Sequence, residues 1–147
     1  MIVGMQMKHF KIEELIWCYR ENGARCRECP LKTKAERVPN GAEENERALV
    51  EAVLDPARER LGMPITVNSG FRCAVHNKAV GGVANSQHMR GEAVDVSCAD
   101  NKRLAEIIEQ NGKYDQLIRY MNKNGGIRFI HVSWKRSGVN RKMKFNK

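Results

Sequence analysis

The stretch Ser86-Gln87-His88-Met89-Arg90-Gly91-Glu92-Ala93-Val94-Asp95 joins a polar loop to the start of a strand. Val94 and Val96 alternate with Asp95 over residues 93–97, which is the pattern of a β-strand. Because neighbouring side chains of a strand point to opposite faces, Asp95 faces away from the two valines. A carboxylate among strand valines is costly to bury without a compensating partner, and a divalent cation is one such partner. The stretch therefore predicts both a strand and a candidate metal ligand.

A second strand, predicted over 128–134, repeats this arrangement with a histidine. Ile130 and Val132 are expected in the core, whereas His131 faces the other way. The imidazoles of His88 and His131, together with the strand aspartate, are a donor set typical of catalytic zinc, with the fourth position left for water. Either histidine alone would be read as an ordinary surface or core residue. It is the combination that predicts Zn²⁺ as a cofactor and the hydrolysis of an amide or ester as the chemistry.

Working outward from this region, the other elements predict an α+β fold. Apolar periodicity favours helices over 10–19, 43–60 and 101–111, and strands over 65–69 and 114–120. Pro56 is expected to perturb the second helix or to begin a new first turn. Residues 72–87 have little periodicity and predict a loop. Since helices come first and strands follow, we expect a small antiparallel sheet with helices packed on one side.

Length and composition suit one compact domain over 1–147, because the chain has 147 residues of which 41% are hydrophobic. Within it we expect an irregular, cysteine-containing excursion over 18–41 and a basic tail over 135–147. No apolar run approaches the length of a bilayer, so no membrane span is predicted. No signal peptide is recognised. We therefore expect a chain that is cytoplasmic as synthesised and needs another route for any export.

The net charge of +9 arises from 26 basic and 17 acidic residues and favours polyanions such as nucleic acid, anionic lipid or anionic wall polymers. A plain solvated surface explains the charge equally well. The basic tail has few aromatic residues on which bases could stack, so nucleic acid is not expected as a partner. The five cysteines favour reduced thiols. Cys18, Cys26 and Cys29 could hold a second zinc, but no fourth ligand is evident.

Further ordered motifs flank the candidate metal site. They are Ser69-Gly70-Phe71-Arg72-Cys73, Asn77, Val80-Gly81-Gly82, the stretch 86–95, Tyr114-Asp115-Gln116-Leu117-Ile118 and Phe129-Ile130-His131-Val132-Ser133. In order and spacing they resemble the D-Ala-D-Ala carboxypeptidase-like zinc peptidases, over about residues 10–134. This family cleaves peptide bonds in bacterial cell-wall stem peptides. It includes carboxypeptidases, endopeptidases and phage endolysins, and it shares its fold with the hedgehog signalling domain.

The resemblance implies that His88, Asp95 and His131 are zinc ligands, and that Arg72 and Ser86 face the substrate cleft. A guanidinium can bind a peptide carboxylate or carbonyl. Arg72 could equally form a structural salt bridge, and Ser86 could cap the loop before His88. The implied activity is zinc-dependent hydrolysis of peptidoglycan stem peptides, of D,D-carboxypeptidase or endopeptidase type. The missing signal peptide fits a phage or prophage lysis protein that a lysis system releases to the cell wall.

One position departs from the pattern of the family. Related enzymes carry a catalytic carboxylate a few residues before the last histidine ligand, and Tyr120 stands where a glutamate is expected. The nearest acids are Asp115, expected to be structural, and Glu92, expected to face solvent. Either the general base comes from one of these or from elsewhere, or Tyr120 assists as a hydrogen-bond donor. Otherwise the chain is a zinc-binding, catalytically weak cell-wall-binding or phage-associated module. The bond that is cut and the oligomeric state stay open.

Overall fold

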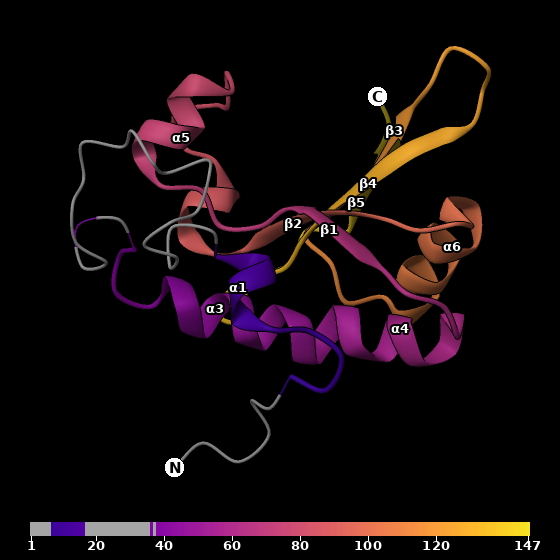
Figure 1. The fold of residues 1–147 in the computed structure, drawn as a ribbon, viewed down its shortest axis with the longest axis horizontal. Helices are drawn as coiled ribbons and strands as arrows, with labels where there is room; N and C mark the ends of the chain where they lie inside the picture. The colour runs from indigo at the N-terminus through magenta and orange to yellow at the C-terminus, as the bar shows by residue number, and fades with distance from the viewer. Residues whose placement is uncertain (1–6, 17–35, 37) are drawn as a thin grey trace.

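One five-stranded sheet organises the computed structural model, which describes residues 7–16, 36 and 38–147 (Figure 1). The strand order is β1-β2-β4-β3-β5, and every pairing is antiparallel except that of β5 with β3. The expected α+β class is therefore confirmed. The strands are β1 (Thr66–Ser69), β2 (Ala93–Ser97), β3 (Gln116–Met121), β4 (Ile127–Ser133) and β5 (Met143–Asn146).

The principal helices lie on one side of this sheet. Three consecutive segments, α3, η2 and α4, run as one long helix below the sheet, with α6 beside α4, whereas the short helix α5 lies on the other side (Figure 1). No helix among the described residues is both long and apolar enough to cross a bilayer. The bounds are α1 (Ile12–Leu15), α3 (Ala42–Leu49), the π-helix η2 (Val50–Leu54), α4 (Asp55–Leu61), α5 (Ala74–Ala79), the 3₁₀-helix η3 (Gln87–Arg90) and α6 (Asn101–Asn111).

Pro56 perturbs the long helix as predicted. Proline lacks a backbone N–H, and its ring crowds the carbonyl of the preceding turn. The chain accommodates the ring with the π-helical segment η2, in which the N–H of Asp55 donates to the carbonyl of Val50, five residues earlier. The helix then continues as α4 and ends at Gly62, whose positive φ of 73° suits glycine.

The two faces of the sheet have different roles. Val94 and Val96 of β2 and Ile130 and Val132 of β4 are fully buried against the helices, as expected from their alternation. The opposite face carries Asp95, His131, Ile118 and Phe145, one from each of four neighbouring strands. The register pairs Asp95 with His131, His131 with Ile118, and Ile118 with Phe145. This row of four side chains crosses the sheet and forms the floor of the site described below.

Two elements differ from the sequence-based expectations. The prediction of a loop over 72–87 was wrong for α5, a helix of only six residues, which is too short to display an apolar period. Its first turn is capped by Cys73, whose Sγ accepts a hydrogen bond from the N–H of His76 at 3.4 Å. The predicted basic tail, residues 135–147, contains the unforeseen strand β5, all of whose residues are exposed. The predicted cysteine excursion lies mainly outside the described residues, as do Cys18, Cys26 and Cys29.

Candidate metal centre

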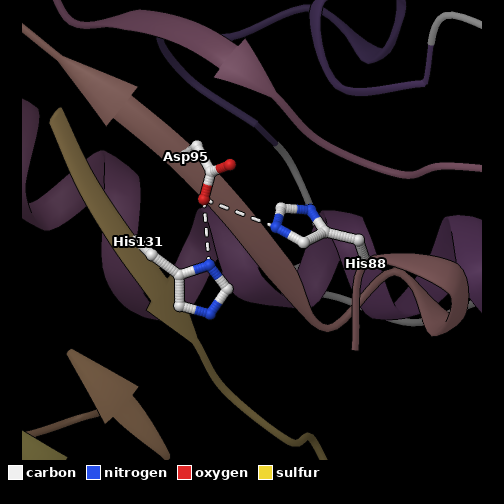
Figure 2. Close-up of side chains that lie close together, drawn as sticks. All are labelled: His88, Asp95 and His131. Atoms are coloured by element: carbon white, nitrogen blue, oxygen red, sulfur yellow. Dashed lines mark hydrogen bonds and ion pairs between the residues drawn. The ribbon is translucent and has the colours of Figure 1, made fainter. Parts of the chain in front are cut away.

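Three side chains that are far apart in the sequence meet on the open face of the sheet. His88, Asp95 and His131 each offer one ligand atom, and these atoms lie within 4.8 Å of one another (Figure 2). Nδ1 of His131 lies 2.9 Å from Oδ1 of Asp95, and Nε2 of His88 lies 3.4 Å from the same oxygen. Both imidazoles therefore converge on one carboxylate oxygen.

Strand pairing positions two of the three groups. Asp95 of β2 lies directly opposite His131 of β4 in the antiparallel register, so their side chains project from the same face. Since the valines and isoleucines on either side of them are buried among the helices, neither side chain can turn to the other face. The rigid core thus determines the separation of these two donors.

The third group is delivered by a loop that packs against α3. Oγ of Ser86 caps the short helix η3 by accepting from the N–H of His88 at 3.2 Å. Gly91 ends η3 with a φ of 73°. A Cβ at this glycine would lie 2.1 Å from the carbonyl oxygen of Ala42, and Nδ2 of Asn45 donates to the carbonyl of Arg90 at 2.9 Å. Close packing on α3 therefore holds the histidine loop in place.

The His88 ring is oriented by a backbone carbonyl. Nδ1 lies 2.8 Å from the carbonyl oxygen of Gly70, which can only accept, so this nitrogen carries a proton. In the neutral ring Nε2 then presents a lone pair toward Asp95, and two acceptors face each other at 3.4 Å. A carbonyl behind a histidine ligand is a recurrent support for metal sites. Adjacent donors of tetrahedral zinc lie about 3.3 Å apart, so this donor set fits the metal.

Asp95 is ionised in this setting. Its burial by itself would raise the carboxyl pKa, but the interactions of the carboxylate with the imidazoles of His131 and His88 outweigh burial and hold the pKa of Asp95 well below its usual value. Nη2 of Arg72 adds a cationic contact, 3.4 Å from Oδ2. The carboxylate is thus anionic across the physiological range, as a metal ligand must be.

Arg72 has structural partners as well as a place in the cleft. Besides Asp95, its side chain contacts Oγ of Ser69 at 3.1 Å and Oδ1 of Asn77 at 3.5 Å, and its backbone N–H donates to the carbonyl of His88 at 3.0 Å. Both alternatives considered for Arg72 are therefore compatible with the structure. It supports a candidate ligand while its side chain lines the open cleft.

A cleft of about 670 Å³ opens above these residues. The candidate ligands and Ile118 belong to its floor, the loop after α5 borders it on one side, and β5 borders it on the other. Its described lining residues are Arg72, Gly81, Gly82, Val83, Asn85, Ser86, Gln87, His88, Arg90, Asp95, Asp115, Gln116, Ile118, Tyr120, His131, Lys135, Arg141, Phe145 and Lys147.

Comparison with known proteins agrees with this arrangement. The sequence model of the peptidase M15 family matches residues 8–133, and this range contains all three candidate ligands. The chain belongs to the peptidase M15 family. The resemblance to D-Ala-D-Ala carboxypeptidase-like peptidases is thereby confirmed. A zinc D-Ala-D-Ala carboxypeptidase of Streptomyces albus G is 50% identical over 44 residues, which are 29% of this chain and 17% of that protein.

Asp115 of this M15 peptidase is engaged in an ion pair. It is fully buried, and Nη2 of Arg141 lies 2.6 Å from Oδ2 while Nε lies 3.0 Å from Oδ1. These contacts, chiefly the hydrogen bond from Arg141, lower the pKa of Asp115 to about 2. A carboxylate held in this way is a weak proton acceptor at neutral pH, and its geometry fits the structural role expected from its place near the start of β3.

The other two candidates for proton transfer differ in position. Tyr120 lines the cleft, and its ring stacks on Phe129 with centroids 4.4 Å apart. Glu92 is not among the described lining residues, and its carboxylate lies 2.9 Å from Nε of Arg90. The Glu92 side chain is only 13% exposed, so the expectation that it faces solvent was wrong.

Three contributors to the M15 site were not foreseen as such. The carbonyl of Gly70 orients His88, and Phe145 and Lys147 of the C-terminal segment line the cleft. Gly70 belongs to the motif Ser69-Gly70-Phe71-Arg72-Cys73, but the role of a backbone carbonyl cannot be predicted from the pattern of side chains. The last two residues lie after residue 133, where the family match ends, so the resemblance gave no information about them.

Proposed function

We propose that this M15 peptidase is a zinc enzyme that hydrolyses peptide bonds in peptidoglycan stem peptides. The observation that carries the proposal is the convergence of His88, Asp95 and His131 at the floor of an open cleft. The similarity to the Streptomyces relative, a zinc D-Ala-D-Ala carboxypeptidase, supports both the metal and the substrate class.

Each residue next to the candidate ligands can be assigned a separate role. Bound by the three candidate ligands, zinc would polarise a peptide carbonyl and acidify water enough for hydrolysis at neutral pH. The carbonyl of Gly70 keeps Nε2 of His88 directed at the site, and Arg72 keeps Asp95 in place. Since Arg72 and Ser86 also line the cleft, we assign them to substrate binding as well.

We assign Tyr120 to hydrogen bonding with the substrate during the reaction. Its side chain lines the cleft, whereas Asp115 is occupied by Arg141 and Glu92 by Arg90. A phenol that donates to the oxygen on which negative charge develops would replace part of what a carboxylic acid does in related enzymes.

The decisive experiment is mass analysis of defined muropeptides after incubation with the zinc-loaded protein. Loss of a terminal D-Ala would identify a D,D-carboxypeptidase, and internal cleavage an endopeptidase. Activity should disappear with a chelator, return with zinc, and be absent in H88A. Cleavage that survives complete removal of metal, verified by elemental analysis, would overturn the proposal.

A second candidate function is a zinc-binding module that attaches to the cell wall with little turnover. In the described part of the chain, Asp115 is the one carboxylate that lines the cleft besides the candidate ligand Asp95. Its ion pair with Arg141 leaves it a poor general base, which favours this second function. Stoichiometric zinc, sedimentation with purified cell walls and no muropeptide cleavage would support this function. Whether the protein acts as a peptidase or as a binding module, we propose that a phage or prophage lysis system releases it to the cell wall.

A further inference from the structure

The segment after the family match forms one side of the cleft. Residues 134–147 follow β4, and β5 adds to the edge of the sheet parallel to β3. Phe145 pairs with Ile118 in this register, so the row of residues on the floor continues onto β5. Phe145 and Lys147 both line the cleft, and we call residues 135–147 the C-terminal wall.

Hydrogen bonds to Asp115 and within the segment hold the C-terminal wall in position. The backbone N–H of Arg141 donates to Oδ1 of Asp115 at 2.8 Å, in addition to the ion pair of their side chains. The N–H of Met143 donates to the carbonyl of Asp115 at 2.9 Å. The side chain of Asn140 bonds both the N–H and the carbonyl of Lys135 at 2.8 and 3.0 Å. The wall is thus an ordered part of the site.

The cleft carries an excess of positive charge. Five basic side chains and two acidic ones belong to its described lining, and both acids already have cationic or imidazole partners. Arg72 and Arg141 are engaged by these acids, and Arg90 by Glu92. The remaining cations, Lys135 and Lys147, both belong to the C-terminal wall.

These two lysines have charge to offer a ligand. Nζ of Lys147 lies 5.9 Å from the centroid of the Tyr120 ring, and no carboxylate in the described part of the chain forms an ion pair with it. Nζ of Lys135 lies 3.7 Å from an oxygen of Asp115 that already accepts from Arg141. Phe145, which the register places between them, is 39% exposed and offers an apolar surface to a ligand.

We propose that Lys135 and Lys147, one at each end of the wall, each attract a carboxylate of the peptide substrate, while Phe145 between them packs against its aliphatic part. The C-terminal wall thereby makes the cleft select anionic peptides over neutral ones. This inference rests on the proposed function, because it names the class of peptide that the same site accepts. Two partly exposed lysines would favour a peptide with free carboxylates about tenfold over its amidated form.

The test compares two peptides of one sequence, one with free carboxylates and one with the same groups amidated. Affinity for the full-length chain is measured by titration with a chelator present, and kcat/KM is measured with zinc. The variant K135Q/K147Q should reduce the preference in affinity from about tenfold to less than twofold. The matched control is K144Q, because Lys144 lies on the other face of β5 and pairs with Glu109. This control should retain the preference of the wild type.

The outcomes separate this inference from the proposed function. The role of the wall is overturned if the wild type binds both peptides with equal affinity. It is also overturned if K135Q/K147Q keeps the wild-type preference and unfolds at the normal temperature. Both conclusions hold whether or not the peptides are cleaved. Preferential binding without cleavage supports the wall and contradicts the peptidase. Added salt should weaken the preference, because exposed ion pairs are screened over about 8 Å at physiological ionic strength.

Discussion

Oδ1 of Asp95 lies 2.9 Å from Nδ1 of His131 and is shared with Nε2 of His88 at 3.4 Å. One carboxylate oxygen thus faces two imidazole nitrogens, of which that of His88 presents a lone pair in the neutral ring. Such a cluster is best satisfied by a cation at its centre, which relates the geometry directly to measurable metal binding.

Replacing Asp95 with asparagine should weaken zinc binding by about 100-fold or more, since even residues behind the ligands alter affinity 10–100-fold. The neutral amide lacks the charge that the metal requires. Competition with a chromophoric chelator measures the effect. A matched change outside the cluster, N68D on β1, should leave the affinity unchanged. Full-strength zinc binding by folded D95N would argue against the site.

Replacing Gly91 with alanine should be far more disruptive than the same change at Gly112. Both have positive φ, 73° and 75°, but a Cβ at Gly91 would lie 2.1 Å from the carbonyl oxygen of Ala42, whereas a Cβ at Gly112 would point into open space in the described part of the chain. We expect G112A to cost about 1 kcal/mol from left-handed strain alone. G91A should cost roughly 3 kcal/mol or more and displace the loop of His88. Equal losses in denaturant unfolding would contradict the packing of this loop on α3.

Disrupting the Asp115–Arg141 pair should alter acid stability. The pKa of Asp115 in the folded chain, about 2, lies below its ordinary value of 3.8. The pair therefore stabilises the fold above about pH 4, and this contribution is lost as the pH falls toward 2. We expect R141M to have a lower free energy of unfolding at neutral pH and to lose this acid dependence. Thermal unfolding between pH 2 and 5 measures both effects.

Glu46 on α3 should be a site at which substitution stabilises the protein. Its side chain is fully buried, and neither carboxylate oxygen has a hydrogen-bond partner in the described part of the chain. Burial raises the pKa of Glu46 well above 4.5. The folded chain therefore keeps a proton that the unfolded chain releases, and the free energy of unfolding falls as the pH rises from 4.5 to the raised pKa.

We expect E46L to increase the free energy of unfolding by about 1–3 kcal/mol at neutral pH. E46Q serves as the control, because it removes the titration but keeps a polar group in the core. The advantage of E46L over the wild type should widen with rising pH, while its difference from E46Q stays constant. A destabilised E46L with a flat pH profile would show that the carboxylate has a partner.

Replacing Tyr120 with phenylalanine should lower kcat about 10- to 100-fold while zinc affinity and KM change little. The aromatic stacking on Phe129 is preserved in this variant, so the change isolates the hydroxyl. Steady-state kinetics on a muropeptide that the mass analysis shows to be cleaved provides the measurement. The control is Y114F, since Tyr114 belongs to the buried core and not to the described cleft lining. An unchanged kcat in Y120F would remove the phenol from the reaction.

Local patterns in the sequence identified several elements closely. The predicted strand 93–97 and helix 101–111 have the observed bounds of β2 and α6, because valine alternation defines the first and Gly112 ends the second. Such signals depend only on residues near in sequence.

Features that depend on pairing between distant segments could not be predicted in this way. Alternation places His131 on the correct face, but nothing in it tells which residue of β2 lies opposite. Strand β5, Met143-Lys144-Phe145-Asn146, alternates apolar and polar residues over only four positions, too few for a clear strand signal. Its place beside β3 follows from the buried Asp115, which accepts from Arg141 26 residues later. The His88 loop likewise depends on the closeness of Gly91 to α3.

The edge position of β5 has an evolutionary consequence. Because β5 pairs with β3 and lies one strand away from the strand of His131, its exposed side chains can change without touching any of the three metal donors. The substrate preference of the site could therefore change in evolution by exchange of about a dozen residues of this segment, provided that the arginine facing Asp115 is retained. Grafting this terminus between relatives offers a compact route to engineered lytic enzymes of chosen preference.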